Sequence, residues 1–181
     1  MKKKVLFIYV LILTIGLTAF IYQMMYLDDS LQKTVSEWSG KEFLLADETK
    51  NQLRFQIEGD SINLSEFIVI SYLDSTTCTS CRIKAFKEVM DRMQKDTDKR
   101  IRSLLIIDSK TLNDINYAIQ QYEFNYPYII DSNENLSKIN GIPKDDKIRT
   151  FLVDSTFHVI LIGNPILNTK IYDLFKNKIK G

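Results

Sequence analysis

Cys78 and Cys81 are the only cysteines in this chain of 181 residues, and two residues separate them. They follow an apolar, β-branched run directly and stand at the start of a segment with helical periodicity. The first turn of a helix presents free N–H groups and the positive end of the helix dipole, both of which stabilise a thiolate. We therefore expect Cys78 to be the exposed thiolate and Cys81 to be more buried. Cys81 can resolve a mixed disulfide or close a disulfide with Cys78.

The other charged and metal-ligating residues narrow the chemistry further. Arg82 adds a positive charge next to the cysteine pair, whereas His158 is the only histidine in the chain. A structural zinc ion takes four ligands, so a zinc site would need carboxylates or a second chain. We predict no metal and no cofactor, apart from a redox-active Cys78–Cys81 disulfide. The formal net charge of +1 gives no electrostatic signature of nucleic-acid binding.

Strand and helix patterns alternate along residues 41–181. The run at 67–73 is continuously apolar and β-branched, as is typical of a strand covered on both faces. In the helix predicted at 79–95, apolar residues recur at helical spacing and form one buried stripe. The other predicted elements are a strand start at 38–45, a hairpin of 53–57 with 61–64, strands at 101–108, 128–131, 150–154 and 158–163, and helices at 111–122, 133–139 and 166–179. This order predicts an α/β fold with a central mixed sheet flanked by helices.

An uncharged run from residue 5 to residue 27 follows Lys2, Lys3 and Lys4. A bilayer core takes about 20 apolar helical residues, whereas the apolar region of a cleaved signal peptide spans about 7–15 residues. The run therefore predicts a single transmembrane helix that stays attached. The positive-inside rule places the N-terminus in the cytoplasm and the rest of the chain in the periplasm or another extracytoplasmic space. We divide the chain into a membrane anchor at 1–27, a linker at 28–40 and a domain at 41–181.

Four segments have the character of one known family. They are Trp38-Ser39-Gly40-Lys41, Thr77-Cys78-Thr79-Ser80-Cys81-Arg82, Tyr128-Ile129-Ile130-Asp131 and Thr150-Phe151-Leu152-Val153-Asp154. With the strand–CxxC–helix order, they resemble thioredoxin-like proteins, and more narrowly the membrane-anchored thiol–disulfide oxidoreductases of the TlpA/redoxin type. The resemblance implies a thioredoxin-like fold, Cys78 as nucleophile and Cys81 as resolving thiol. It also implies an envelope-facing oxidoreductase whose partners are proteins with dithiols or disulfides.

The chain departs from this family around the cysteines. Thr77 stands where the family usually has tryptophan, and Ile148-Arg149 stands where it has a cis-proline, while Pro143 comes too early. A cis bond without proline costs about 2.5–4 kcal/mol, so we predict a trans peptide and a reshaped substrate edge. Arg149 becomes, with Arg82, a candidate for stabilising the thiolate. The departures predict a narrow set of protein partners.

Two alternatives remain open at this point. A peroxidase of the peroxiredoxin type would use Ser75, three residues before Cys78, and Arg149 near the reactive cysteine. A membrane-tethered adaptor with an idle disulfide would explain the missing cis-proline and tryptophan, and slow thiol exchange would distinguish it. Nearby, we expect Asp74 to form a turn or to accept a proton from the second cysteine. We expect His158 to face solvent.

Overall fold

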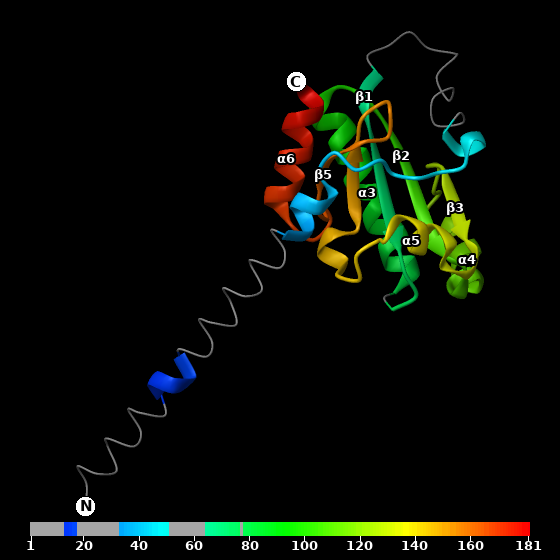
Figure 1. The fold of residues 1–181 in the computed structure, drawn as a ribbon. Helices are drawn as coiled ribbons and strands as arrows, with labels where there is room; N and C mark the ends of the chain where they lie inside the picture. The colour runs from blue at the N-terminus through cyan, green and yellow to red at the C-terminus, as the bar shows by residue number, and fades with distance from the viewer. Residues whose placement is uncertain (1–12, 18–32, 51–63, 77) are drawn as a thin grey trace, which may run out of the picture. The chain divides into compact units, whose positions relative to one another are not determined.

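The chain forms two compact units, Met1–Trp38 and Ser39–Gly181. The structure is a computed structural model, and it describes the ranges 13–17, 33–50, 64–76 and 78–181 (Figure 1). In the first unit, residues 13–17 and 33–38 are helical.

Two predictions fall on residues outside this description. The proposed anchor at 5–27 is described only at 13–17, and the proposed hairpin of 53–57 with 61–64 is described only at its last residue. Among the described residues, no helix is both long enough and apolar enough to span a bilayer.

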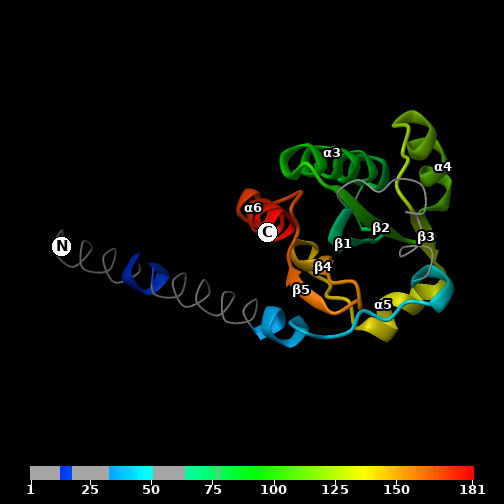
Figure 2. The ribbon, with the colours of Figure 1, turned by 90° about the horizontal axis from the view of Figure 1, so that it is seen from above.

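The second unit is built on one mixed sheet with the strand order β3-β2-β1-β4-β5 (Figures 1 and 2). The strands are β1 (Leu64–Leu73), β2 (Arg100–Asp108), β3 (Tyr128–Asp131), β4 (Thr150–Val153) and β5 (Val159–Ile162). The first three run parallel, whereas β4 is antiparallel to both β1 and β5. β1 lies at the centre, where Val69 is opposite Ser103 of β2 and Leu152 of β4. This mixed α/β sheet has the thioredoxin-like strand order, with the cysteine pair after the central strand, and it confirms the α/β part of the predicted fold class.

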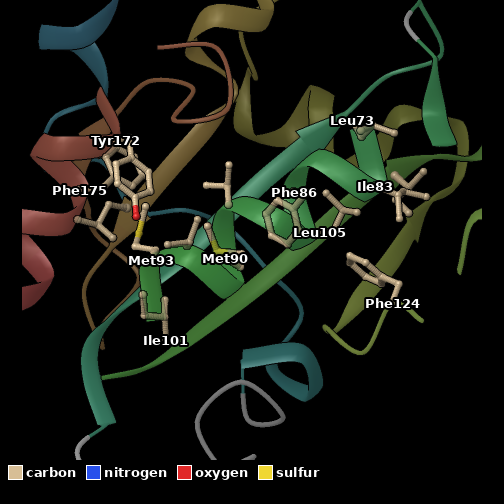
Figure 3. Packing of buried hydrophobic residues seen from close by; sticks show 14 of the residues in the cluster. Leu73, Ile83, Phe86, Met90, Met93, Ile101, Leu105, Phe124, Tyr172 and Phe175 are labelled. Atoms are coloured by element: carbon tan, nitrogen blue, oxygen red, sulfur yellow. The ribbon is translucent and has the colours of Figure 1, made fainter. Parts of the chain in front are cut away.

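Helices cover both faces of this sheet (Figure 2). They are α3 (Thr79–Thr97), α4 (Leu112–Gln121), α5 (Asn135–Asn140) and α6 (Thr169–Lys180). Side chains of α3, α4 and α6 pack with one face of β1 and β2 in a single core cluster (Figure 3). Phe86 and Met90 of α3 and Phe175 of α6 are each only 1% exposed. Burying such side chains stabilises the fold by about 1.5–3 kcal/mol each, so this core fixes the helix that begins at the cysteine pair.

The segment after residue 38 closes the β5 edge of the sheet. The N–H of Gly40 donates to the carbonyl of Val159 at 2.8 Å, and Glu42 forms an isolated antiparallel bridge with His158. The predicted strand start is therefore present as edge pairing. Its end is fixed to α5, because the buried Asn140 accepts from the N–H of Leu44 and donates to its carbonyl, at 2.7 and 3.0 Å.

The predicted elements that the structure describes in the second unit occur with shifted ends. The closing helix α6 begins at Thr169, and not at 166, because the side chain of Asn168 accepts from the N–H groups of Lys170 and Ile171 and caps the helix there. The predicted helix at 111–122 starts at Leu112, after the 3₁₀ turn η1 (Ser109–Thr111). The helix predicted at 133–139 is divided into the 3₁₀ turn η2 (Ser132–Glu134) and α5.

Candidate active site

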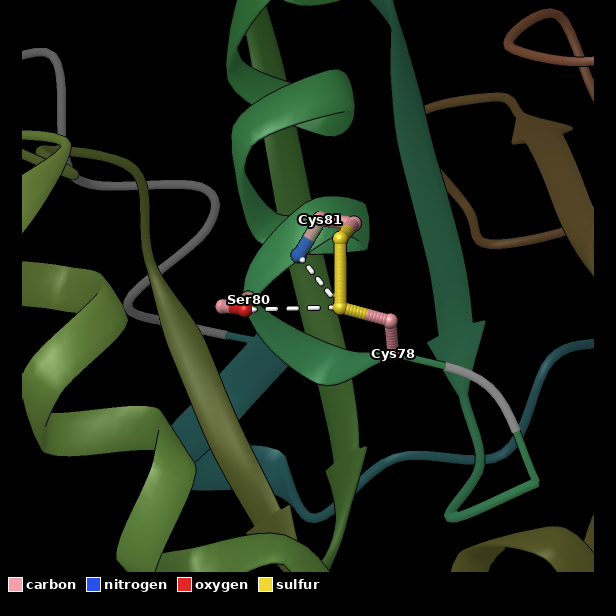
Figure 4. Close-up of a disulfide and its surroundings, with 3 residues drawn as sticks. All are labelled: Cys78, Ser80 and Cys81. Carbon is pink, nitrogen blue, oxygen red and sulfur yellow. Dashed lines mark hydrogen bonds between the residues drawn. A yellow bond between two sulfur atoms is a disulfide. The ribbon is translucent and has the colours of Figure 1, made fainter.

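The cysteine pair lies at the N-terminus of α3, as predicted (Figure 4). Cys78 is the N-cap residue, and a disulfide joins it to Cys81, with the two Cα atoms 5.4 Å apart. The Cys78 sulfur accepts from the N–H of Cys81 at 3.4 Å and lies 3.4 Å from the Ser80 hydroxyl. A disulfide sulfur has no hydrogen to give, so the hydroxyl donates. Both donors would also stabilise a negative charge on this sulfur after reduction.

The exposure of the second cysteine differs from the prediction. Cys78 and Cys81 are both exposed, whereas Thr79 between them is 4% exposed. The reason is the helical turn: Thr79, and then Ile83 and Phe86, face the core, so Cys81 lies on the outer side. Cys81 is therefore not the buried member of the pair.

Asp74 shapes the turn that leads from β1 to the cysteines. Its Oδ1 accepts from the Thr76 N–H at 3.2 Å and from the Thr76 hydroxyl at 2.7 Å, which confirms the predicted turn role. Its Oδ2 forms an ion pair with Arg149. Burial alone raises the pKa of Asp74, but the bonds from Thr76 and the pair with Arg149 outweigh burial and hold that pKa below its usual value.

Arg149 engages this carboxylate, and not the cysteines. Its side chain is 8% exposed, and it also donates to the carbonyls of Pro143, at 2.8 Å, and Lys144. The guanidinium thus ties residues 142–149, which we call the opposite loop, to the turn before the cysteines. The prediction that Arg149 would stabilise the thiolate by pointing at Cys78 is not met in this disulfide form.

A second ion pair fixes the opposite loop to α3. Arg82, the residue after Cys81, forms an ion pair with Asp146 of the 3₁₀ turn η3 (Asp146–Ile148). The positive charge predicted beside the cysteines is present, but this carboxylate balances it. Arg82 and Arg149 are therefore positioning residues in this structure, since each holds the loop that faces the redox motif.

Tyr72 lies near the end of β1, before the turn that leads to the cysteines, and its side chain is buried. Its hydroxyl donates to Asp131 at 3.3 Å, and Asp131 in turn accepts from the N–H groups of Leu136 and Ser137 at the start of α5. Burial raises the pKa of Tyr72 far above its usual range, with the charge of Asp131 adding to the effect. Tyr72 therefore stays protonated and structural.

Several other predictions concern neighbouring residues. No peptide bond among the described residues is cis, so the predicted trans bond at Ile148-Arg149 is confirmed. Arg149 is held by Asp74 and by two carbonyls, and Ser75 is exposed in the turn, so the arrangement does not favour the peroxidase.

His158 is exposed, as predicted, and its Nδ1 is 2.8 Å from the Thr156 hydroxyl. The described residues contain no cluster of three or more metal-ligating side chains.

The ion-pair partners of the two arginines were not predicted from the sequence. The available signal was the pairing of the strands at 67–73 and 150–154. In that pairing Ser71 lies opposite Thr150, and the Tyr72 N–H donates to the Arg149 carbonyl at 2.9 Å, so Arg149 must lie close to Asp74. Asp146, in contrast, lies in an irregular turn that no pattern predicts.

No family model and no curated protein sequence matches the chain. Among solved structures, it is similar to a putative thiol:disulfide interchange protein DsbE from Chlorobium tepidum, at 15% identity over 65% of this chain and 82% of that chain, with a TM-score of 0.49. It is also similar to StoA from Bacillus subtilis, at 17% identity over 65% and 91%, with a TM-score of 0.42. The thioredoxin domain of a thiol-disulfide oxidoreductase from Bacteroides vulgatus matches at 12% identity over 64% and 80%, with a TM-score of 0.48. These likenesses concern the fold at low identity, so the functional proposal rests on the site itself.

Proposed function

We propose that the protein is a thiol–disulfide oxidoreductase that exchanges the Cys78–Cys81 dithiol or disulfide with partner proteins. The observation that supports this most is the position of Cys78 as the N-cap of α3, with its sulfur exposed and facing backbone and hydroxyl donors. A sulfur in that position is favoured as thiolate and is open to attack.

The exchange proceeds in two balanced steps. The Cys78 thiolate attacks one sulfur of the partner's disulfide, which forms a mixed disulfide and releases the partner's other sulfur as a thiolate. The Cys81 thiolate then attacks the Cys78 sulfur, closes the intramolecular disulfide and releases the second partner thiolate. Two electrons pass from this protein to the partner, and the reverse sequence oxidises a partner dithiol.

The test measures the redox equilibrium of the Cys78–Cys81 pair in the purified protein. The purified protein is incubated in glutathione buffers of stepped potential, and its free thiols are counted over time. We expect exchange within minutes and a potential between about −270 mV, typical of a reductant, and about −120 mV, typical of an oxidant. A disulfide that stays closed below about −300 mV and exchanges only over hours would favour the adaptor instead.

We also propose that residues 5–27 anchor the protein in a membrane, with the domain outside the cytoplasm. The uncharged run behind Lys2, Lys3 and Lys4 supports this location, and a compartment that permits disulfides suits the proposed chemistry. Carbonate extraction and the mass of the mature N-terminus test it: the full-length protein is expected in the membrane pellet. A soluble product that begins near residue 28 would refute the anchor.

A further inference from the structure

A pocket of about 400 Å³ lies at the carboxyl end of the parallel strands, next to the turn that precedes the cysteines. One wall is the turn itself, with Asp74, Ser75 and Thr76. The other walls are Asp108 at the end of β2, Lys110 after it, and Pro143 and Lys144 of the opposite loop. Ligands of open α/β sheets bind at this end of the strands. Since Thr76 is two residues before Cys78, a peptide joined to the Cys78 sulfur has the pocket within reach.

Most charges around the pocket are already paired. Asp74 is bound by Arg149, and Glu134 forms an ion pair with Lys110. Asp108 is 3% exposed, and its carboxylate accepts from the backbone N–H of Lys110. The acidic groups of the lining are therefore occupied by the protein's own donors.

Lys144 is the exception in this lining. It is exposed, and its ammonium forms no hydrogen bond or ion pair with the residues that the structure describes, although its charge, after those of Lys110 and Lys138, helps to lower the pKa of Glu134. Its backbone is held in place, because the Lys144 carbonyl accepts from Arg149 and that arginine is bound to Asp74. Three ammonium groups thus act on the single carboxylate of Glu134, and Lys144 of the opposite loop supplies part of this excess positive charge beside the redox motif.

We infer that this pocket is a specificity site for an acidic peptide segment next to the partner's cysteine, with Lys144 binding its carboxylate. The inference rests on the proposed exchange function and names the class of partner for it. Three ammonium groups around one carboxylate leave excess positive charge at this pocket wall, which favours a carboxylate over a cationic or neutral group. The charge of Lys144 also selects among partners, in agreement with the narrow partner set that the missing cis-proline predicts.

Three disulfide-linked model peptides provide the test, each with the cysteine flanked by glutamates, lysines or serines. The readout is the second-order rate constant for oxidation of the reduced, full-length protein. We expect the acidic peptide to react about three- to fivefold faster than the basic peptide, which is the range of an exposed ion pair. This preference should fade at 1 M salt, where the screening length falls to about 3 Å.

Variants distinguish the effect of a charge in the pocket on the reaction rate from the effect of a charge elsewhere on the protein. Lys144→Gln should bring the ratio of acidic to basic rates near one, and Lys144→Glu should reverse it. Lys147→Glu makes the same charge change in the same loop, on an exposed residue outside the pocket lining, and should keep the wild-type preference. A preference that is absent in the wild type, or that survives Lys144→Glu, overturns this inference while the exchange function stands. Failure of the wild type to react with all three peptides overturns the exchange function itself.

Discussion

Replacing Cys78 with serine is expected to abolish thiol–disulfide exchange, whereas replacing Cys81 with serine leaves the first step intact and traps it. A serine hydroxyl does not attack a disulfide at neutral pH, because the attacking species must be a thiolate. The Cys81→Ser variant still has the attacking sulfur at the N-cap of α3 but lacks the group that resolves the mixed disulfide. Non-reducing mass spectrometry after incubation with a disulfide peptide should therefore detect an adduct only in Cys81→Ser.

The same variant allows the thiolate to be titrated. In Cys81→Ser, the alkylation rate of Cys78 as a function of pH should give an apparent pKa below the ordinary thiol value of about 8.5. The physical reason is the N–H of residue 81, the Ser80 hydroxyl and the helix dipole, which all favour the charged sulfur. The matched control is Cys78→Ser, in which Cys81 sits inside the helix and lacks the N-cap position. Equal, unshifted titrations in the two variants would contradict a catalytic Cys78 and favour the adaptor.

Arg149→Met is expected to lower the free energy of unfolding by about 3 kcal/mol, at the lower end of the range for breaking a buried ion pair. The methionine fills much of the space but leaves the Asp74 carboxylate, only 15% exposed, without its partner. The carbonyls of Pro143 and Lys144 lose their donor as well. Denaturation with urea measures the change.

Matched variants show whether the pair itself is responsible. Lys147→Met removes an exposed cation from the same loop and should change the stability by less than about 0.5 kcal/mol. In a double-mutant cycle with Asp74→Asn, the two substitutions should couple by at least about 0.5 kcal/mol. Additive effects of Asp74→Asn and Arg149→Met would show that the ion pair does not hold the opposite loop.

The contribution of Asp74 should also depend on pH. Its pKa is below the usual value in the folded protein, so its interactions stabilise the fold at any pH above the unfolded pKa of about 3.9. This stability is lost as the pH falls through the lower, folded pKa. The difference in stability between wild type and Asp74→Asn should accordingly be constant at neutral pH and shrink below about pH 4.

The sequence alone was sufficient to predict the regular elements that the structure describes in the second unit. The run at 67–73 is β1 without its first residues, and the helix predicted at 79–95 is α3 without its last two residues. Their patterns are local: a doubly covered strand reads as a continuous apolar run, and a helix packed on one side shows one apolar stripe. The place of Cys78 at the helix start follows from the same neighbouring residues. Element ends were less predictable, because they depend on caps such as Asn168.

What surrounds the cysteines was decided only by the tertiary structure. Asp74 and Arg149 are 75 residues apart in sequence, and their contact depends on β4 pairing antiparallel with β1. Arg82 meets Asp146 because an irregular turn brings that loop back over α3. Local periodicity specifies which face of an element is apolar. A charged side chain, in contrast, can form an ion pair with any opposite charge that the fold brings near it. The sequence therefore determined the position of the cysteine pair, whereas the fold determined that both arginines hold the opposite loop and that Lys144 lies in the lining of the pocket.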